Sequence, residues 1–139
     1  MYSITAECAF DSAHFLKGYT GKCSNIHGHR WRVVCEVQSE KLEMAGACRG
    51  MLVDFGILKE ALKSITDLFD HALIYEIGSL SCESLVAFEK EGFLLKEVPF
   101  RPTAECFSEF FYLEMEKRGF LMTSLTVFET PTNSATYRR

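Results

Sequence analysis

Two alternating segments near the N-terminus constrain the fold of this 139-residue chain more than any other feature. From residue 2 to residue 10, apolar side chains occupy every second position, and the same alternation returns between Trp31 and Gln38. Alternation with period two is typical of a β-strand with one buried face. A loop containing Gly18 and Gly21 separates the segments. We therefore expect two neighbouring strands at the start of the chain.

Helical periodicity occurs twice in the rest of the chain. Apolar residues recur at helical spacing from Phe55 to Phe69, behind Asp54, which suits the N-cap position. A second helix is expected after Thr103, another plausible N-cap, and Gly119 suits its C-terminal end. These two helices would each present one apolar face to a sheet.

The remaining segments complete an α+β pattern. Residues 51–54 are predicted to be extended, residues 75–96 to be irregular with at most a short helix, and residues 121–129 to form a last strand. The sequence therefore predicts one domain over residues 1–139, with a mainly antiparallel sheet of about four strands and two helices on one face. A sheet this small needs its edges covered or paired with another subunit.

Charge and apolar content exclude two classes of partner. The formal net charge is −4 at pH 7 and no basic run is present, so we expect no nucleic-acid binding. No apolar run approaches the length of a membrane span, and the first residues carry no export signal, so we expect a cytoplasmic protein without membrane contact. The six cysteines include no Cys-x-x-Cys pair, which argues against a disulfide framework.

Three histidines lie at the ends of the two N-terminal segments. His27 and His29 share the phase of Trp31, and His14 continues the phase of the first segment. If the segments pair as a hairpin, the three imidazoles converge. Three nitrogen ligands with an open fourth position are typical of catalytic zinc, although imidazole also suits iron and other divalent ions. One histidine alone would indicate only a polar strand end, whereas three at this spacing predict a metal site.

Cys23 precedes His27 by four residues and is therefore close to the expected metal. As a fourth ligand it would close the site and make it structural. As a thiolate it would act as a base, because a nearby dication and histidine lower the pKa of a thiol. The spacing alone leaves both interpretations open.

A second acid–base group is expected at Asp70-His71, near the end of the first helix. A histidine at a helix C-terminus commonly stabilises the helix dipole. The functional alternative is a proton relay, in which Asp70 orients His71 and His71 exchanges a proton with a thiol or a substrate.

Two glutamates are weaker candidates. Glu129 continues the apolar phase of the last strand, where a carboxylate needs a partner. A salt bridge at the strand end is the ordinary explanation, and a bidentate contact to the paired N–H groups of a guanidine-like ligand is the functional one. Glu105 lies in the first turn of the second helix, where the helix dipole favours a carboxylate whatever its function.

Together these residues resemble the family of 6-pyruvoyltetrahydropterin and 6-carboxytetrahydropterin synthases. The match covers nearly the whole chain, and a Cys-x3-His-Gly-His block followed by Asp-His and Glu-Thr is highly specific. The matching motifs are Phe10-Asp11-Ser12-Ala13-His14, Cys23 to His29, Val53-Asp54-Phe55, Leu68-Phe69-Asp70-His71, Pro102-Thr103-Ala104-Glu105, and Glu129-Thr130 with Tyr137.

The resemblance implies a T-fold, in which a four-stranded antiparallel sheet with two helices joins others in a trimeric barrel, and two trimers stack as a homohexamer. It also implies roles for the singled-out residues. His14, His27 and His29 would bind Zn²⁺, Cys23 would be the general base, Asp70 and His71 its relay across a subunit interface, Glu129 the anchor for the pterin 2-amino and N3 groups, and Glu105 with Thr103 auxiliary pocket residues.

The bacterial branch of the family is the closer match, in length and in the ending 129–133. It implies a carbon–carbon lyase that converts 7,8-dihydroneopterin triphosphate to 6-carboxy-5,6,7,8-tetrahydropterin, acetaldehyde and triphosphate, on the route to queuosine. Formation of 6-pyruvoyltetrahydropterin is the alternative within the family. The alternative from another class is a zinc-stabilised binding module with Cys23 as the fourth ligand and no turnover.

Overall fold

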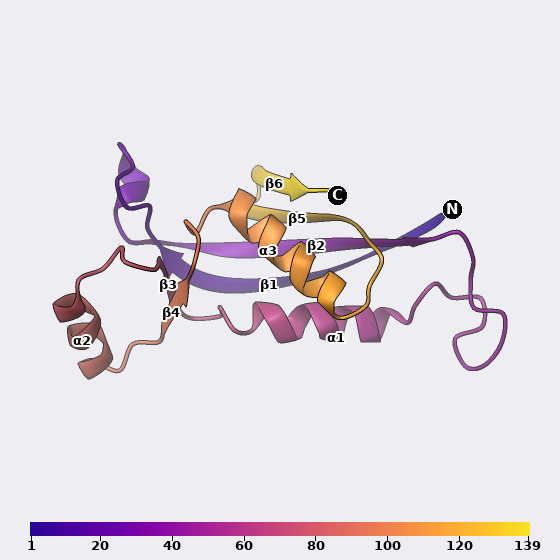
Figure 1. The fold of residues 1–139 in the computed structure, drawn as a ribbon. Coiled ribbons are helices and arrows are strands. Elements are labelled where there is room, and N and C mark those ends of the chain that lie inside the picture. Colours follow the sequence, from indigo (N-terminus) through magenta and orange to yellow (C-terminus); the bar gives the residue numbers. More distant parts are fainter.

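The computed structural model describes residues 1–139 and contains one six-stranded sheet covered by helices on one face (Figure 1). The strand order across the sheet is β4-β3-β1-β2-β5-β6. The strands are β1 (Tyr2–His14), β2 (His27–Ser39), β3 (Leu73–Glu76), β4 (Leu95–Val98), β5 (Met122–Thr130) and β6 (Asn133–Tyr137). The helices are α1 (Phe55–Thr66), α2 (Cys82–Lys90) and α3 (Ala104–Lys117), with a short 3-10 helix at Lys22–Ser24.

The hairpin of β1 and β2 is the backbone of the sheet, as the alternating segments predict. Its antiparallel register runs without a break from Tyr2 opposite Ser39 to His14 opposite His27. Side chains directly opposite one another share a face, so the apolar positions of both strands point to the same side. The side chains of the hairpin that share this phase next to the connecting loop, including His14 and His27, therefore lie on the same face of the sheet.

The core lies between that face and the helices α1 and α3. Its centre is aromatic: Trp31 is fully buried, with Phe10 stacked beside it at 6.0 Å between ring centroids. Phe107 of α3 meets the Trp31 ring edge-on at 5.3 Å. Such edge-to-face contacts add roughly 0.5–1.5 kcal/mol to the gain from burying the rings. This dense packing fixes the end of the hairpin that carries the histidines.

Both predicted helix starts are confirmed. The Asp54 carboxylate accepts hydrogen bonds from the N–H groups of Gly56 and Ile57 and caps α1. The Thr103 hydroxyl accepts from Cys106 N–H and caps α3, and Gly119 follows the end of α3 with φ of 88°. The predicted continuation of the first helix to residue 69 is wrong, because α1 ends at Thr66 and Phe69 is buried from the turn that follows.

The prediction of four strands and two helices is corrected to six strands and three α-helices. Residues 51–54 form no strand. The strands missed by the pattern are β3, β4 and β6, of four, four and five residues. Strands this short carry too few residues for alternation to be recognised. β3 and β4 also run parallel to β1, so the sheet is mixed rather than purely antiparallel.

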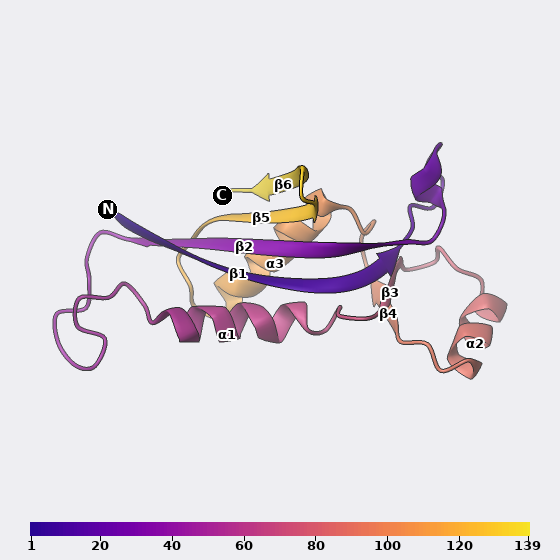
Figure 2. The same cartoon turned by 180° about the vertical axis from the view of Figure 1, so that it is seen from behind.

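The third helix, α2, lies apart from the core. None of its residues is buried, and it lies at the end of the sheet where β3 and β4 are found, beyond α1 and α3 (Figure 2). The helix has nine residues and lies within residues 75–96, where at most a short helix was expected. Its apolar residues adjoin one another from Leu85 to Phe88 and span little more than one turn. No helix is long and apolar enough to cross a membrane.

Candidate metal centre and its surroundings

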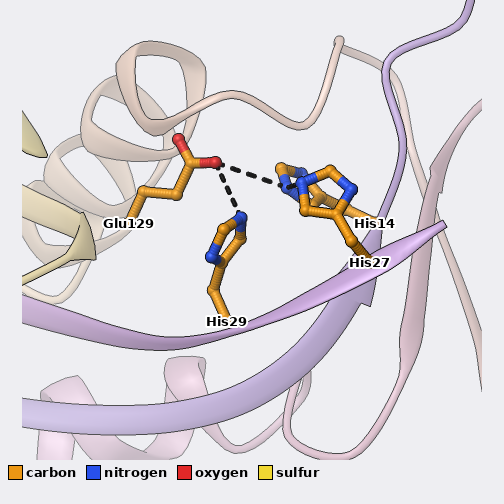
Figure 3. Close-up of side chains that lie close together, drawn as sticks. All are labelled: His14, His27, His29 and Glu129. Carbon is orange, nitrogen blue, oxygen red and sulfur yellow. Dashed lines mark hydrogen bonds and ion pairs between the residues drawn. The ribbon is translucent and has the colours of Figure 1, made fainter. Parts of the chain in front are cut away.

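The three histidines converge at the loop end of the hairpin, as the hypothesis of a metal site requires. His14 lies opposite His27, and His29 lies opposite Ser12 in the register of β1 and β2. Glu129, near the end of β5, points into the same group from the neighbouring strand (Figure 3). One potential ligand atom from each of these four residues lies within 4.8 Å of all the others.

Backbone carbonyls orient two of the imidazoles. Nδ1–H of His14 donates to the carbonyl of Pro102 at 2.7 Å, and Nδ1–H of His27 donates to the carbonyl of Asn25 at 2.7 Å. Both rings therefore carry the proton on Nδ1 and turn Nε2 toward the group. A hydrogen bond from the second ring nitrogen is the usual way in which proteins fix the tautomer of a metal-binding histidine.

The arrangement of the inner nitrogens fits a bound cation. Nε2 of His14 and Nε2 of His27 are 3.1 Å apart, with a lone pair on each in the tautomers just described. Nε2 of His29 is buried, and Oε1 of Glu129, at 2.8 Å, is its one polar contact. The facing lone pairs of His14 and His27 are unfavourable unless a cation accepts them. Three imidazoles suit Zn²⁺ and several other divalent ions.

The protonation states also suit metal binding. Burial lowers the pKa of His14 to about 4, which leaves its ring neutral at pH 7. Burial also lowers the pKa of His29, although the neighbouring Glu129 carboxylate opposes the shift. A histidine binds metal in its neutral form, so these shifts reduce the competition from protons.

Trp31 forms the base of the group and was not predicted as a site residue. Its ring centroid lies 4.9 Å from the His14 ring and 5.4 Å from the His29 ring, both edge-on. The signal for Trp31 was present in the sequence, since it shares the phase of His27 and His29. The carbonyls of Asn25 and Pro102 left no such signal, because a main-chain acceptor is independent of residue type.

Asp70 and His71 form a hydrogen-bonded pair in the turn after α1. Nδ1 of His71 lies 2.9 Å from Oδ2 of Asp70, and His71 has a left-handed backbone with φ of 58°. Such a conformation is uncommon outside glycine and indicates a constrained position. Neither residue makes a hydrogen bond or ion pair with the three histidines of the metal group.

Asp70 and His71 each shift the pKa of the other toward its charged form. The hydrogen bond that Nδ1–H of His71 donates to the Asp70 carboxylate raises the pKa of His71. The pKa of Asp70 is lowered first by the N–H of Asp11 and then by His71. His71 borders a cavity of about 670 Å³ whose polar lining also includes Asp11, His29 and Arg30. An exposed histidine paired with a carboxylate beside a cavity can exchange protons with a molecule bound there.

The structure leaves Cys23 outside the metal group. Cys23 is half-buried in the 3-10 helix of the hairpin loop, its thiol makes no hydrogen bond, and only its carbonyl is engaged, by Leu16 N–H at 2.8 Å. Glu105 is exposed in the first turn of α3, next to the capping residue Thr103. The structure therefore assembles His14, His27, His29 and Glu129, and it does not join Cys23, Glu105 or the Asp70-His71 pair to them.

The fold and the side-chain group together define an α+β protein with a candidate three-histidine metal centre at the end of a long hairpin. The family model for 6-pyruvoyl tetrahydropterin synthase matches residues 3–139. The chain therefore belongs to the 6-pyruvoyl tetrahydropterin synthase family.

Curated relatives match over the full length. One from Haemophilus influenzae, named 6-carboxy-5,6,7,8-tetrahydropterin synthase, is 37% identical over 99% of this chain and 99% of its own. A relative of the same name from a Synechocystis species is 32% identical over 99% of this chain and 93% of its own.

Solved structures share the fold at lower sequence identity. An uncharacterized protein from Wolinella succinogenes superimposes with a TM-score of 0.80 at 21% identity, covering 99% of this chain and 98% of its own. The 6-pyruvoyl tetrahydropterin synthase of Plasmodium vivax superimposes with a TM-score of 0.73 at 20% identity, covering 99% and 97%. The architecture is therefore that of pterin synthase structures.

Proposed function

We propose that this chain is a 6-carboxy-5,6,7,8-tetrahydropterin synthase, a Zn²⁺-dependent carbon–carbon lyase. It would convert 7,8-dihydroneopterin triphosphate to 6-carboxytetrahydropterin, acetaldehyde and triphosphate, on the route to queuosine. The observation that carries the proposal is the convergence of three imidazoles and Glu129 in a chain 37% identical, over its full length, to a relative of that name.

The metal group would have two functions. His14, His27 and His29 would hold Zn²⁺, and the bound ion would supply Lewis acidity toward the side-chain hydroxyls of the substrate. Glu129 would accept hydrogen bonds from the 2-amino and N3 groups of the pterin ring, because a carboxylate matches two parallel N–H donors. Its side chain is 28% exposed and, with His29, lines a second cavity of about 440 Å³, so a ligand can reach it.

Proton transfer would be divided between two places in the fold. Cys23 would act as the general base, with Asp70 and His71 as its relay and Glu105 and Thr103 at the edge of the pterin pocket. The side chain of His71 is 77% exposed. An exposed pair that makes no bond to the metal group of its own chain is suited to serve the site of a neighbouring chain.

We infer that the working unit is a homohexamer of single domains, each spanning residues 1–139, built from two stacked trimers. The short edge strands β4 and β6 and the exposed apolar residues Phe55 and Ile57, 61% and 55% exposed, support association, because edges and apolar surface are commonly covered by another subunit. Active sites between subunits would follow from the position of Asp70-His71.

A second activity keeps the same site. The matching family model and the Plasmodium vivax structure carry the name 6-pyruvoyl tetrahydropterin synthase. Formation of the 6-pyruvoyl product would use the same metal group and the same pterin anchor. The two activities differ in whether the substrate side chain is cleaved.

The test is incubation of the zinc-loaded protein with 7,8-dihydroneopterin triphosphate, followed by assay of acetaldehyde and of the pterin product. One acetaldehyde per 6-carboxytetrahydropterin is the expected result. A 6-pyruvoyl product without acetaldehyde would show that the chain has the second activity instead. Intact zinc without turnover would favour the zinc-stabilised binding module instead.

A further inference from the structure

One residue of β1, Asp11, contacts both members of the Asp70-His71 pair through its main chain. Its N–H donates to Oδ1 of Asp70 at 3.0 Å, and its carbonyl accepts from the N–H of His71 at 2.6 Å. These two bonds fasten the turn after α1 to the centre of the sheet. They also hold His71 in its left-handed backbone conformation. Without such contacts a residue other than glycine would relax to a more favourable conformation.

The side chain of Asp11 is held in turn by β2. Oδ2 of Asp11 accepts from Nη1 of Arg30 at 2.9 Å, and the two residues lie directly opposite in the register of β1 and β2. Both line the cavity of about 670 Å³ that His71 borders. A second carboxylate therefore shares this cavity with His71, and Arg30 fixes its orientation and offsets part of its charge.

Few other charges act on His71. From its own turn the imidazole faces Asp70, and from β1 it faces Asp11, whose carboxylate is paired with Arg30 of β2. His29 reaches the rim of the same cavity, and Lys63 of α1 acts on Asp70. The remaining wall of the cavity carries no charged side chain and is mostly apolar, with Phe88, Phe93 and Leu94 among its residues.

We propose that the Asp11–Arg30 pair is a positioning element for the Asp70-His71 pair, with the Asp11 carboxylate as a second anion opposite the imidazole and Arg30 as the group that limits its influence. The proposal rests on the proposed function in assigning His71 a role in turnover. The electrostatic coupling of Asp11 and Arg30 to His71 does not depend on that role.

The first test measures protonation of His71 directly. The zinc-loaded protein is labelled with ¹³C at histidine Cε1 and titrated by NMR, and the His71 signal is assigned from its loss in His71→Asn, since asparagine tolerates a left-handed backbone. Asp11→Asn should lower the titration midpoint by roughly 0.3 pH unit and Arg30→Met should raise it by a similar amount, because a screened unit charge a few ångströms away acts on this scale. The double variant should have a midpoint close to that of Asp11→Asn, because Arg30 influences His71 by offsetting the charge of Asp11.

The chain provides a matched control. Glu7 and Arg32 also form a carboxylate–arginine pair between β1 and β2 at 2.9 Å, diagonal in the register rather than directly opposite, and neither lines the cavity of His71. Glu7→Gln removes one arginine-paired carboxylate, as Asp11→Asn does, and should leave the His71 midpoint unchanged. A midpoint that moves equally in Glu7→Gln and Asp11→Asn, or in neither, would overturn the coupling. Arg30→Met keeps the test decisive if Asp11→Asn folds poorly.

The second test connects the pair to turnover. In the pH profile of kcat/KM of the parent enzyme, the limb that coincides with the NMR midpoint of His71 should move in the same direction as that midpoint in Asp11→Asn and in Arg30→Met. A midpoint that moves while the limb stays in place would overturn the role in the reaction. If the parent enzyme turns over none of the substrate, the proposed function fails, and the NMR titration still decides whether Asp11 and Arg30 act on His71.

Discussion

At the level of single residues, the burial of His14 makes stability depend on pH. Its pKa in the folded chain is about 4, below the ordinary value of 6.5. Between these values the unfolded chain binds a proton that the folded chain does not, so the free energy of unfolding falls as the pH falls from 6.5 to 4. The shift corresponds to at most about 3 kcal/mol.

Urea denaturation of the metal-free protein at several pH values checks this prediction. His14→Gln should flatten the decline in stability between pH 6.5 and pH 4 relative to the parent chain. His71→Asn is the control and should not flatten it, because the folded-state pKa of His71 is raised and its contribution has the opposite sign. Parallel curves for the parent and His14→Gln would show that His14 does not carry the effect.

The Cys23→Ala variant distinguishes two roles of the Cys23 thiol, that of a general base and that of a metal ligand. With the thiol outside the metal group, we expect Cys23→Ala to keep one zinc per chain while turnover falls by about 100-fold or more, the usual effect of removing a general base. Metal analysis after dialysis and the acetaldehyde assay measure the two quantities. His29→Gln, which removes a histidine of the group, should lose zinc. Loss of zinc in Cys23→Ala would instead make the thiol the fourth ligand.

The residue pattern predicted that His14, His27 and His29 would converge once their strands paired, because alternation along a strand determines which side chains share a face. Glu129 was expected on the buried phase of the last strand, as a salt-bridge partner or a pterin contact, and its position among the histidines was not predicted. The position of Cys23 was not predictable, since the loop between the strands has no periodicity. The left-handed backbone of His71 could not be predicted from the sequence either, because it depends on contacts with Asp11, which is far away in the chain.

At the level of elements, Thr103 caps α3 and is also proposed to lie at the edge of the pterin pocket. Its hydroxyl caps α3, and loss of an N-cap costs about 1 kcal/mol. Thr103→Ala should therefore reduce the free energy of unfolding by that amount in urea denaturation, and Thr103→Ser should restore it. A rise in KM in Thr103→Ala that Thr103→Ser reverses would support the substrate contact as well. Unchanged stability in Thr103→Ala would contradict the cap.

The elements found from the sequence are those that bury a face. The strands β1, β2 and β5 and the helices α1 and α3 each contribute to the core, and each has a period that the sequence displays. The nine-residue helix α2 and the four-residue strands β3 and β4 are too short for their patterns to identify them. β6 has only five residues, of which Ala135 and Tyr137 pack against the core, and its pairing with β5 is determined by the tertiary structure.

At the level of the whole molecule, a site shared between chains can be tested by mixing inactive variants. Cys23→Ala and His71→Asn should each be inactive alone. Unfolded together in equal amounts and refolded, they should recover roughly a quarter of the parent activity, because a random closed oligomer pairs an intact Cys23 with an intact His71 at that frequency. Light scattering should give about 95 kDa for six chains of 15.8 kDa.

No recovery in the mixture, with a hexameric mass confirmed, would mean that each site is built from one chain. Mixing each variant with itself provides the control for refolding. A monomeric mass would contradict the assembly directly.

The contact of Trp31 with the histidines has an optical consequence. The chain contains one tryptophan, and its ring lies edge-on against His14 and His29. Indole emission is sensitive to the charge of its immediate neighbours, so the intrinsic fluorescence of this protein should change when a cation binds to the imidazoles. Occupancy of the centre can then be followed in solution by titrating zinc into the metal-free chain, without a label and without substrate.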